Sequence, residues 1–196
     1  MVPSPCKAFL PLESNPTVFN ELIQLLGVSP RLAFEDIFSL DDNPDLLLSR
    51  PALALILVFP ADDVLEADAL SDRPAYAGFG SEEPVLWFRQ TIQNACGLYA
   101  VLHAVCNGAA RGYIETDGPL AGLLERAVPL SPADRAKVLE DSAELEGAHA
   151  AVAVKGDSAV PGSAEEEVEF HYVAFVGGQD GRVWELDGDR KGPVET

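Results

Sequence analysis

The feature that most constrains the fold is an apolar run that begins at a cysteine. After Cys96, apolar residues recur at helical spacing: Leu98, Val101, Leu102 and Val105. Asn107 and Gly108 then supply a stop signal, so the pattern predicts a helix that begins at Cys96. The positive end of a helix dipole favours thiolate over thiol at such a position. The alternative is a structural cysteine, because free cysteines are among the most buried side chains.

A carboxamide precedes this cysteine. Gln90 lies six residues before Cys96 in the segment QTIQNACG, residues 90–97. The backbone N–H of a residue at a helix start is one of the unpaired donors there. With a side-chain amide beside it, that N–H can stabilise a developing oxyanion. We therefore expect Gln90 and the N–H of Cys96 to act together.

A hairpin near the C-terminus holds a histidine and an aspartate. Residues 168–176 and 182–187 are rich in aromatic and β-branched residues, and a Gly-rich turn separates them. If Val176 pairs with Arg182, His171 lies directly opposite Asp187, within reach of an imidazole–carboxylate hydrogen bond. A turn of another length would shift this register. The alternative is a hairpin with an unrelated histidine and a turn-capping aspartate.

These residues have defined roles in thiol hydrolysis. Cys96 would attack a carbonyl, and His171 would take its proton and return one to the leaving amine. Asp187 would fix the imidazole tautomer and favour imidazolium. Spacing alone does not bring the helix start to the hairpin. The chemistry therefore predicts a cysteine hydrolase and leaves its substrate open.

The same motifs, in order, resemble the ubiquitin C-terminal hydrolases, a family of papain-like thiol peptidases. The similarity covers residues 90–97, the histidine strand FHYVA at 170–174, the aspartate segment WELDG at 184–188 and the opening LPLESNP at 10–16. It implies an α+β fold, a papain-like cysteine hydrolase with a central antiparallel sheet flanked by helices. It also implies catalytic roles for Cys96, His171, Asp187 and Gln90, with no cofactor and no metal.

The resemblance further suggests how a substrate is held. Ubiquitin ends in Arg-Leu-Arg-Gly-Gly, and acidic residues near the cleft of these enzymes receive the arginines. The positions of this chain that match the family's tail-binding residues are Leu12, Glu13, Asp36, Glu169 and Phe170. Short acidic motifs recur by chance, so each of these carboxylates has the alternative of being a surface charge. The expected partner is ubiquitin or a ubiquitin-like protein.

Residues 147–167 are rich in small residues and lead into the histidine strand. A loop of about 20 residues without its own structure is uncommon, and is usually functional or disordered. In the resembled family it is the crossover loop over the active site, which would select small or unfolded leaving groups. Family members also continue past the aspartate loop with another helix and strand, and they have Asp-Gly-Arg in that loop. This sequence has DGDR at 187–190 and ends at Thr196.

Length, charge and cysteine usage limit the classes of protein. The 196 residues suit one domain, residues 1–196, and the longest apolar run, residues 52–59, is too short to span a membrane. Three cysteines without metal-like or disulfide-like spacing suit a reducing cytosol or nucleus, and no secretory signal is evident. The net charge of −19 points to a cationic partner or to solubility, and the lack of basic clusters gives no reason to expect nucleic-acid binding. We expect a monomer in the cytoplasm, with the nucleus as a second location.

The remaining patterns predict scaffold. Asn15-Pro16 should begin a helix that ends near Gly27, and Ser131 should cap a helix that continues to about Glu146. Residues 52–59, bounded by prolines, predict a central strand buried on both faces, and residues 32–40 predict another strand. Three functions remain open. The first is a deubiquitinating thiol hydrolase, and the second is a ubiquitin-binding protein whose catalysis is reduced because the chain is short at its C-terminus. The third is a papain-like acyltransferase or hydrolase with an unrelated substrate.

Overall fold

A computed structural model describes residues 6–39, 51–61, 73–158, 162–164, 166 and 170–196. Within these residues the strands form one antiparallel sheet in the order β1 (Ala54–Pro60), β2 (Phe170–Gly177), β3 (Val183–Leu186) and β4 (Val194–Glu195). Chain order and sheet order agree. The histidine strand β2 is therefore an inner strand, with β1 on one side and β3 on the other.

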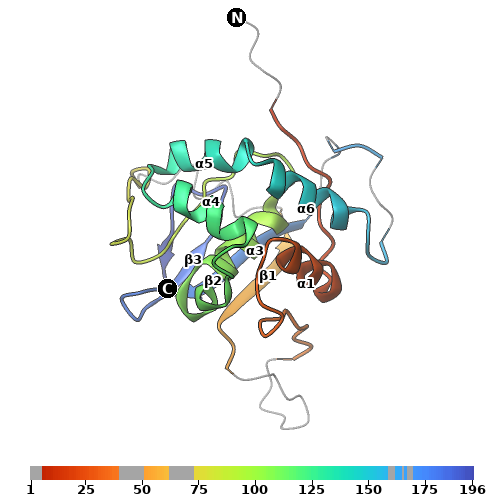
Figure 1. Cartoon of the computed structure of the whole chain (residues 1–196), viewed down its shortest axis with the longest axis horizontal. Coiled ribbons are helices and arrows are strands. Elements are labelled where there is room, and N and C mark those ends of the chain that lie inside the picture. Colours follow the sequence, from red (N-terminus) through yellow and green to blue (C-terminus); the bar gives the residue numbers. More distant parts are fainter. Residues whose placement is uncertain (1–5, 40–50, 62–72, 159–161, 165, 167–169) are drawn as a thin grey trace, which may run out of the picture.

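The helices cover the sheet as Figure 1 shows. They are α1 (Pro16–Leu25), α3 (Cys96–Cys106), the 3₁₀ helix η1 (Gly108–Tyr113), α4 (Pro119–Ala127), α5 (Pro132–Glu140) and α6 (Ala143–Ala153). Helix α3 packs against β2 and β1, α1 lies beside α6, and α4 lies beside α5. No helix in the described residues is long and apolar enough to cross a membrane. This arrangement is the α+β architecture that the sequence predicts.

Two predicted helix starts are confirmed. The Asn15 side chain accepts a hydrogen bond from the N–H of Thr17, and Pro16 occupies the first turn of α1. The helix ends before Gly27, whose φ of +81° is one that glycine adopts without strain. Ser131 caps α5 by accepting from the N–H of Asp134. Local capping chemistry therefore sets these boundaries.

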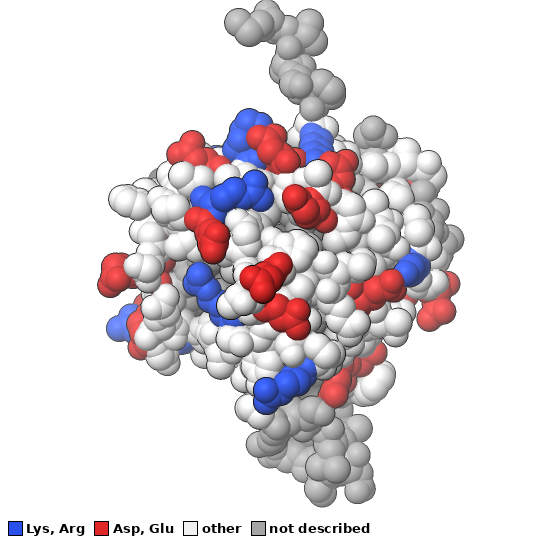
Figure 2. All heavy atoms as spheres, viewed as in Figure 1, with Lys and Arg blue, Asp and Glu red and all other residues white. Residues whose placement is uncertain are grey.

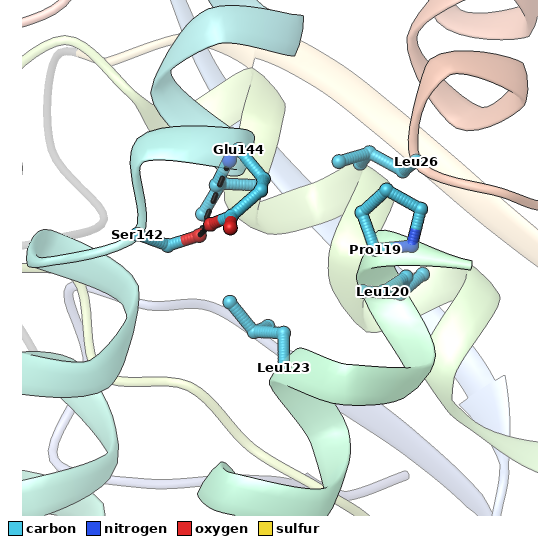
Figure 3. A pocket seen from close by; sticks show the side chains of 7 residues that line it. Leu26, Pro119, Leu120, Leu123, Ser142 and Glu144 are labelled. Carbon is cyan, nitrogen blue, oxygen red and sulfur yellow. Dashed lines mark hydrogen bonds between the residues drawn. The ribbon is translucent and has the colours of Figure 1, made fainter. Parts of the chain in front are cut away.

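The helix predicted from Ser131 to about Glu146 is wrong in its second half. Helix α5 ends at Glu140, and Ser142 begins α6 by accepting from the N–H of Leu145. Figure 3 shows this junction, where Ser142 also contacts Glu144. A second N-cap interrupted the predicted run, because it offers the backbone an alternative to continuing the first helix.

Helix α6 also shortens the predicted crossover loop of residues 147–167. Residues 147–153 belong to this helix, so the non-helical connection begins at Val154. His149 lies in this helix and is buried, and its Nε2 lies 2.8 Å from the carbonyl oxygen of Leu10. Burial lowers the pKa of His149 to about 4, so it packs as a neutral core residue.

The strand assigned to residues 52–59 is present, but its predicted environment is wrong. Strand β1 is an edge strand, and Leu55 and Leu57 are 39% and 47% exposed. Its apolar run suggested burial on both faces because both inward and outward positions are apolar. Only the inward set, including Ile56 and Val58, packs against the core.

Residues 32–39 form no strand, contrary to the prediction, and residue 40 lies outside the described part of the chain. The backbone of Phe34 is instead held by one side chain of α1. Asn20 Oδ1 accepts from the N–H of Phe34 at 2.6 Å, and Asn20 Nδ2 donates to its carbonyl oxygen at 3.0 Å. An asparagine side chain thus takes the place of a neighbouring strand.

Candidate active site

Helix α3 begins at Cys96, as the apolar pattern predicts. Every residue of α3 is buried, and Cys96 is 7% exposed. The turn before it is made possible by Asn94, which has a φ of +57°, a conformation that asparagine adopts more readily than most residues. The thiol therefore lies at the N-terminal end of a buried helix, where the dipole favours a negative charge.

His171 lies near the start of β2 and Asp187 directly after β3, and their side chains meet. His171 Nε2 is 2.9 Å from Asp187 Oδ1, and both side chains are almost fully buried. The predicted register was wrong by two residues, because Gly177 pairs with Val183 and the turn covers residues 178–182. A displacement of two residues keeps each side chain on its face of the sheet. The predicted pair therefore survives as a diagonal contact.

The hairpin turn explains the displacement. The N–H of Gly178 donates to the carbonyl oxygen of Arg182 at 2.8 Å, which closes the turn one residue later than expected. Asp180 Oδ1 accepts from the N–H of Arg182 and from Trp184 Nε1, and Gly181 has a φ of +78°. These side-chain bonds place the turn, and the strand pattern alone did not contain them.

The imidazole of His171 contacts Cys96 as well as Asp187. Burial alone would lower the pKa of His171, but its contacts with Asp187 and Cys96 outweigh burial and raise the pKa to about 10. Because Nε2 faces Asp187, Nδ1 is the nitrogen available to Cys96. An imidazolium beside a cysteine at a helix start is the environment that stabilises a thiolate.

The Asp187 carboxylate has further partners on its own loop. Its Oδ1 accepts from the N–H of Asp189 at 3.0 Å, and its Oδ2 lies 3.6 Å from Arg190 Nε. Arg190 also pairs with Glu185 at 2.8 Å. His171 and Arg190 thus lie on two sides of the Asp187 carboxylate, and hydrogen bonds between charged groups are stronger than those between neutral ones.

Hydrogen bonds from residues 73–90 hold the aspartate loop, residues 187–191, in place. Trp87 Nε1 donates to the carbonyl oxygen of Asp187 at 2.8 Å, and the N–H of Gln90 donates to that of Gly188 at 2.8 Å. The N–H of Tyr76 donates to the carbonyl oxygen of Lys191 at 2.7 Å. A Cβ on Gly188 would lie only 2.8 Å from Gln90 Cβ, so the two segments touch.

We call residues 73–90, which hold the aspartate loop, the clamp. A buried ion pair anchors this clamp. Arg135 of α5 lies 2.6 Å from Glu83, and their side chains are 0% and 4% exposed. Arg135 also donates to the carbonyl oxygen of Trp87 at 2.8 Å. The same backbone segment thus connects α5 to the loop that carries Asp187, a long-range contact that no local sequence pattern predicts.

Gln90 lies where its backbone supports the site. Its N–H donates to the carbonyl oxygen of Gly188, and its Oε1 is buried without a hydrogen-bond partner among the described residues. The structure thus brings the backbone and Cβ of Gln90 against the aspartate loop.

The predicted substrate-binding residues separate into different environments. Leu12 is buried against Gly97 of α3, and its carbonyl oxygen accepts from the Tyr172 hydroxyl at 2.9 Å. Phe170 is 54% exposed and directly precedes His171. Asp36 is exposed and lies in the irregular segment after α1. Glu169 lies outside the described residues.

Glu13 is already occupied in this structure. Its carboxylate accepts from the N–H groups of Ser158 and Asp157, at 2.7 and 3.1 Å, and from Asn15 Nδ2. The hydrogen bond from Ser158, with those from Asn15 and Asp157, lowers the pKa of Glu13 to about 2. Glu13 therefore binds the segment that follows α6.

Sequence reasoning missed the role of Asn94. Its Nδ2 donates to the carbonyl oxygens of Ala164 and Glu166, at 2.8 and 2.7 Å. The residue was part of the cysteine motif, and its two-residue spacing from Cys96 was the only available signal. Asn94 ties the far end of the same segment to the nucleophile turn.

His103 is excluded as a base for Cys96, as the helical spacing suggests. It is fully buried, its Nε2 accepts from the N–H of Phe88 at 3.0 Å, and its ring stacks on Phe88. Burial lowers the pKa of His103 to about 4, so it is a neutral core residue.

The hollow drawn in Figure 3, lined by Leu26, Pro119 and Leu123, contains none of the catalytic candidates.

Comparison with known proteins agrees with this geometry. The family described as ubiquitin carboxyl-terminal hydrolase, family 1, matches residues 9–196. A ubiquitin carboxyl-terminal hydrolase of Aplysia californica is 36% identical over 190 residues, which cover 95% of this chain and 84% of that protein. Ubiquitin carboxyl-terminal hydrolase 3 of Arabidopsis thaliana is 31% identical and covers 97% of this chain and 80% of that protein.

A solved structure extends the agreement to three dimensions. The UCH37 catalytic domain of Trichinella spiralis, bound to ubiquitin vinyl methyl ester, matches with a TM-score of 0.70 at 25% identity. The match covers 95% of this chain and 77% of that one. The papain-like α+β fold expected from the motifs is thereby confirmed. The chain belongs to the ubiquitin carboxyl-terminal hydrolase family 1, a family of cysteine peptidases.

Proposed function

We propose that this protein is a thiol-dependent deubiquitinating hydrolase in which Cys96, His171 and Asp187 form the catalytic triad. The observation that carries the proposal is the buried contact of His171 Nε2 with Asp187 Oδ1 at 2.9 Å, with Cys96 in contact with the same imidazole. The substrate is the C-terminal glycine of ubiquitin in amide linkage to a small or unfolded adduct. The kinship with ubiquitin hydrolases supports this choice of substrate.

The triad performs acyl transfer in two steps. The Cys96 thiolate attacks the glycine carbonyl, and the His171 imidazolium protonates the amine as the C–N bond breaks. The resulting thioester is then attacked by water, whose proton His171 accepts, and cleavage of the C–S bond restores thiolate and imidazolium. Asp187 holds the imidazole in the orientation that both transfers need.

The oxyanion of each tetrahedral intermediate is stabilised by two donors. One is the backbone N–H of Cys96, at the start of α3, and the other is the carboxamide of Gln90. The carboxamide of Gln90 supports this role, because its buried Oε1 has no hydrogen-bond partner among the described residues that would hold the amide elsewhere. Each such donor contributes about 100- to 1,000-fold to the rate.

The segment between α6 and β2 limits which adducts reach Cys96. Its first part is bound by Glu13, and its last part is bound by Asn94, two residues before the nucleophile. Because both described ends of this connection are held in place, we expect it to restrict the size of the leaving group that reaches Cys96. Folded adducts are therefore excluded, and short or unfolded ones pass through.

The ubiquitin tail binds along Leu12, Glu13, Asp36, Glu169 and Phe170. The net charge of −19 favours its arginines through long-range attraction. On the face drawn in Figure 2, acidic and basic side chains are interspersed, so this face presents no single acidic patch. A substrate arginine at Glu13 must share or replace the N–H groups of Asp157 and Ser158.

Hydrolysis of ubiquitin with a fluorogenic amide at its C-terminus tests the function. Wild type should release the fluorophore, and Cys96→Ala should abolish release yet retain ubiquitin binding. Ubiquitin fused to a short flexible peptide should be cleaved, and ubiquitin fused to a stable folded domain should be spared. Chemical unfolding of that domain should restore cleavage.

Three results would contradict the proposal in different ways. Ubiquitin binding without turnover by wild type would support a binding protein instead of an enzyme. Residual turnover by Cys96→Ala would refute the nucleophile assignment. Preference for a ubiquitin-like protein under the same conditions would move the substrate assignment while leaving the triad intact.

A further inference from the structure

The imidazole of His171 has a carboxylate at each nitrogen. Asp187 Oδ1 lies 2.9 Å from Nε2, and Asp189 Oδ2 lies 3.9 Å from Nδ1. The two aspartates are fixed relative to each other, because the N–H of Asp189 donates to Asp187 Oδ1. The triad described above uses only the first of them, although the second faces the nitrogen that serves Cys96.

The two carboxylates differ in exposure and in contact. The Asp187 side chain is 0% exposed and lies at hydrogen-bonding distance, whereas the Asp189 side chain is 34% exposed and lies beyond it. Asp189 therefore acts on the imidazole through its charge. Burial and the neighbouring Asp187 raise the pKa of Asp189, and His171 opposes this rise.

The other groups that face this cluster come from several elements. From the aspartate loop and β3, Arg190 contacts Asp187 and pairs with Glu185. From α3, Cys96 contacts His171, and neutral His103 lies near Asp187. From β1, the uncharged Phe59 ring packs edge-on against His171 at 5.7 Å, and from β2 the Tyr172 hydroxyl is held by Leu12. Among these described groups, Asp189 is the carboxylate on the Nδ1 side.

We propose that Asp189 is a positioning residue that holds the His171 imidazolium from the Nδ1 side and thereby sets the pH range of the reactive Cys96–His171 pair. The proposal rests on the triad of the proposed function. A negative charge near Nδ1 favours the protonated imidazole, and the same charge disfavours a thiolate beside it. Both effects displace the reactive range toward higher pH.

Removal of this charge therefore has a signed consequence. In Asp189→Asn, thiolate formation should begin at lower pH, and the imidazolium should also be lost at lower pH. The two titrations belong to the coupled pair, so the whole profile should move. A residue that only supports the loop would lower the rate equally at every pH and leave both limbs in place.

The test is the pH dependence of Cys96 alkylation by iodoacetamide, followed by mass spectrometry of the Cys96 peptide. Alkylation needs no ubiquitin, so the result is independent of the substrate assignment. Both limbs of the Asp189→Asn profile should move down by about half a pH unit or more at low salt, and high salt should reduce the difference. Asp189→Glu, which keeps the carboxylate, should give the same profile as wild type.

Asp117→Asn is the matched control, because it removes the same charge from an exposed loop before α4. Its profile should superimpose on that of wild type. If Asp189→Asn unfolds within the pH range, Asp189→Ser carries the same test. Superimposable profiles for the Asp189 variant, Asp117→Asn and wild type would overturn the proposal. A uniform loss of rate without a shift would do the same.

Discussion

The two halves of the active site are built in different ways. The nucleophile half is one helix, α3, whose residues are all buried and whose start follows from its own apolar pattern. The aspartate half is a loop after a four-residue strand, held by Trp87, Gln90 and Tyr76 from elsewhere in the sequence. The first half is encoded locally, and the second depends on contacts between distant segments.

This difference predicts where the site is vulnerable. A change near α3 acts on a helix that the surrounding core fixes on every side. A change at the aspartate loop acts on a few hydrogen bonds, and a displacement of about 1 Å can cost roughly 100-fold in rate. Paired substitutions in the two halves should separate the two cases.

The largest effect is expected from Asp187→Asn. Loss of the carboxylate removes the group that orients His171 and favours imidazolium, so kcat/KM at neutral pH should fall by about 1,000- to 10,000-fold. The pKa of His171, which the contacts with Asp187 and Cys96 raise to about 10, should fall. Steady-state kinetics over a pH series check both effects. A fall of less than tenfold would remove Asp187 from the triad.

Glycine substitutions compare the two halves directly. In Gly188→Ala the new Cβ would lie 2.8 Å from Gln90 Cβ and 3.2 Å from its backbone nitrogen, so the loop must shift. We expect about 1–3 kcal/mol lower stability from this overpacking, and a rate loss of roughly 100-fold.

Gly97→Ala is its partner on α3, where the nearest contact is 3.3 Å to Leu12 Cβ. Alanine favours a helix by about 1 kcal/mol, so its free energy of unfolding should stay within about 1 kcal/mol of wild type. Urea denaturation measures both variants. Equal destabilisation of the two would contradict the distinction between a locally and a distantly supported half.

Trp87→Phe should have a smaller effect than Gly188→Ala on the rate. It removes the bond from Trp87 Nε1 to the carbonyl oxygen of Asp187, worth about 0.5–1.5 kcal/mol, and leaves a small void. Tyr99→Phe on α3 is the comparison, since its hydroxyl meets the N–H of Thr91 only at 3.4 Å. Thermal unfolding and kcat should both fall further for Trp87→Phe, and the reverse order would count against the clamp.

The smallest effect on stability is expected at Glu13, whose carboxylate tethers the segment after α6 through the N–H groups of Asp157 and Ser158. Its pKa is lowered to about 2, so its stabilising contribution is present above its ordinary value of 4.5 and is lost as pH falls toward 2. The difference in unfolding temperature between wild type and Glu13→Gln should therefore vanish across that range. Glu125→Gln, an exposed change on α4, should show no such window. A constant difference at all pH values would argue against the tether.

The sequence was sufficient where local rules decide. The start of α3 at Cys96, the caps of α1 and α5, and the pairing of His171 with Asp187 all follow from spacing and capping chemistry. It failed where distant or competing contacts decide. Asn20 replaced a strand partner for Phe34, and Ser142 began a new helix within a predicted one.

The hairpin shows both outcomes in one element. With the hydrogen bonds that Asp180 accepts, the observed turn lies one residue later than the predicted turn, and the strand register differs from the predicted register by two residues. The catalytic pair survived because a strand repeats every two residues. Its clamp at Trp87 and the second carboxylate at Asp189 depend on tertiary contacts, which composition and spacing do not encode.

Cys96 and the aspartate loop should form one reactive site. The most direct measurement is covalent labelling by ubiquitin vinyl methyl ester, with the modified residue mapped by mass spectrometry. Wild type should be labelled at Cys96 alone, and Asp187→Asn should be labelled far more slowly while still binding ubiquitin. Labelling at Cys6, no labelling at all, or equal rates for the two proteins would contradict the claim.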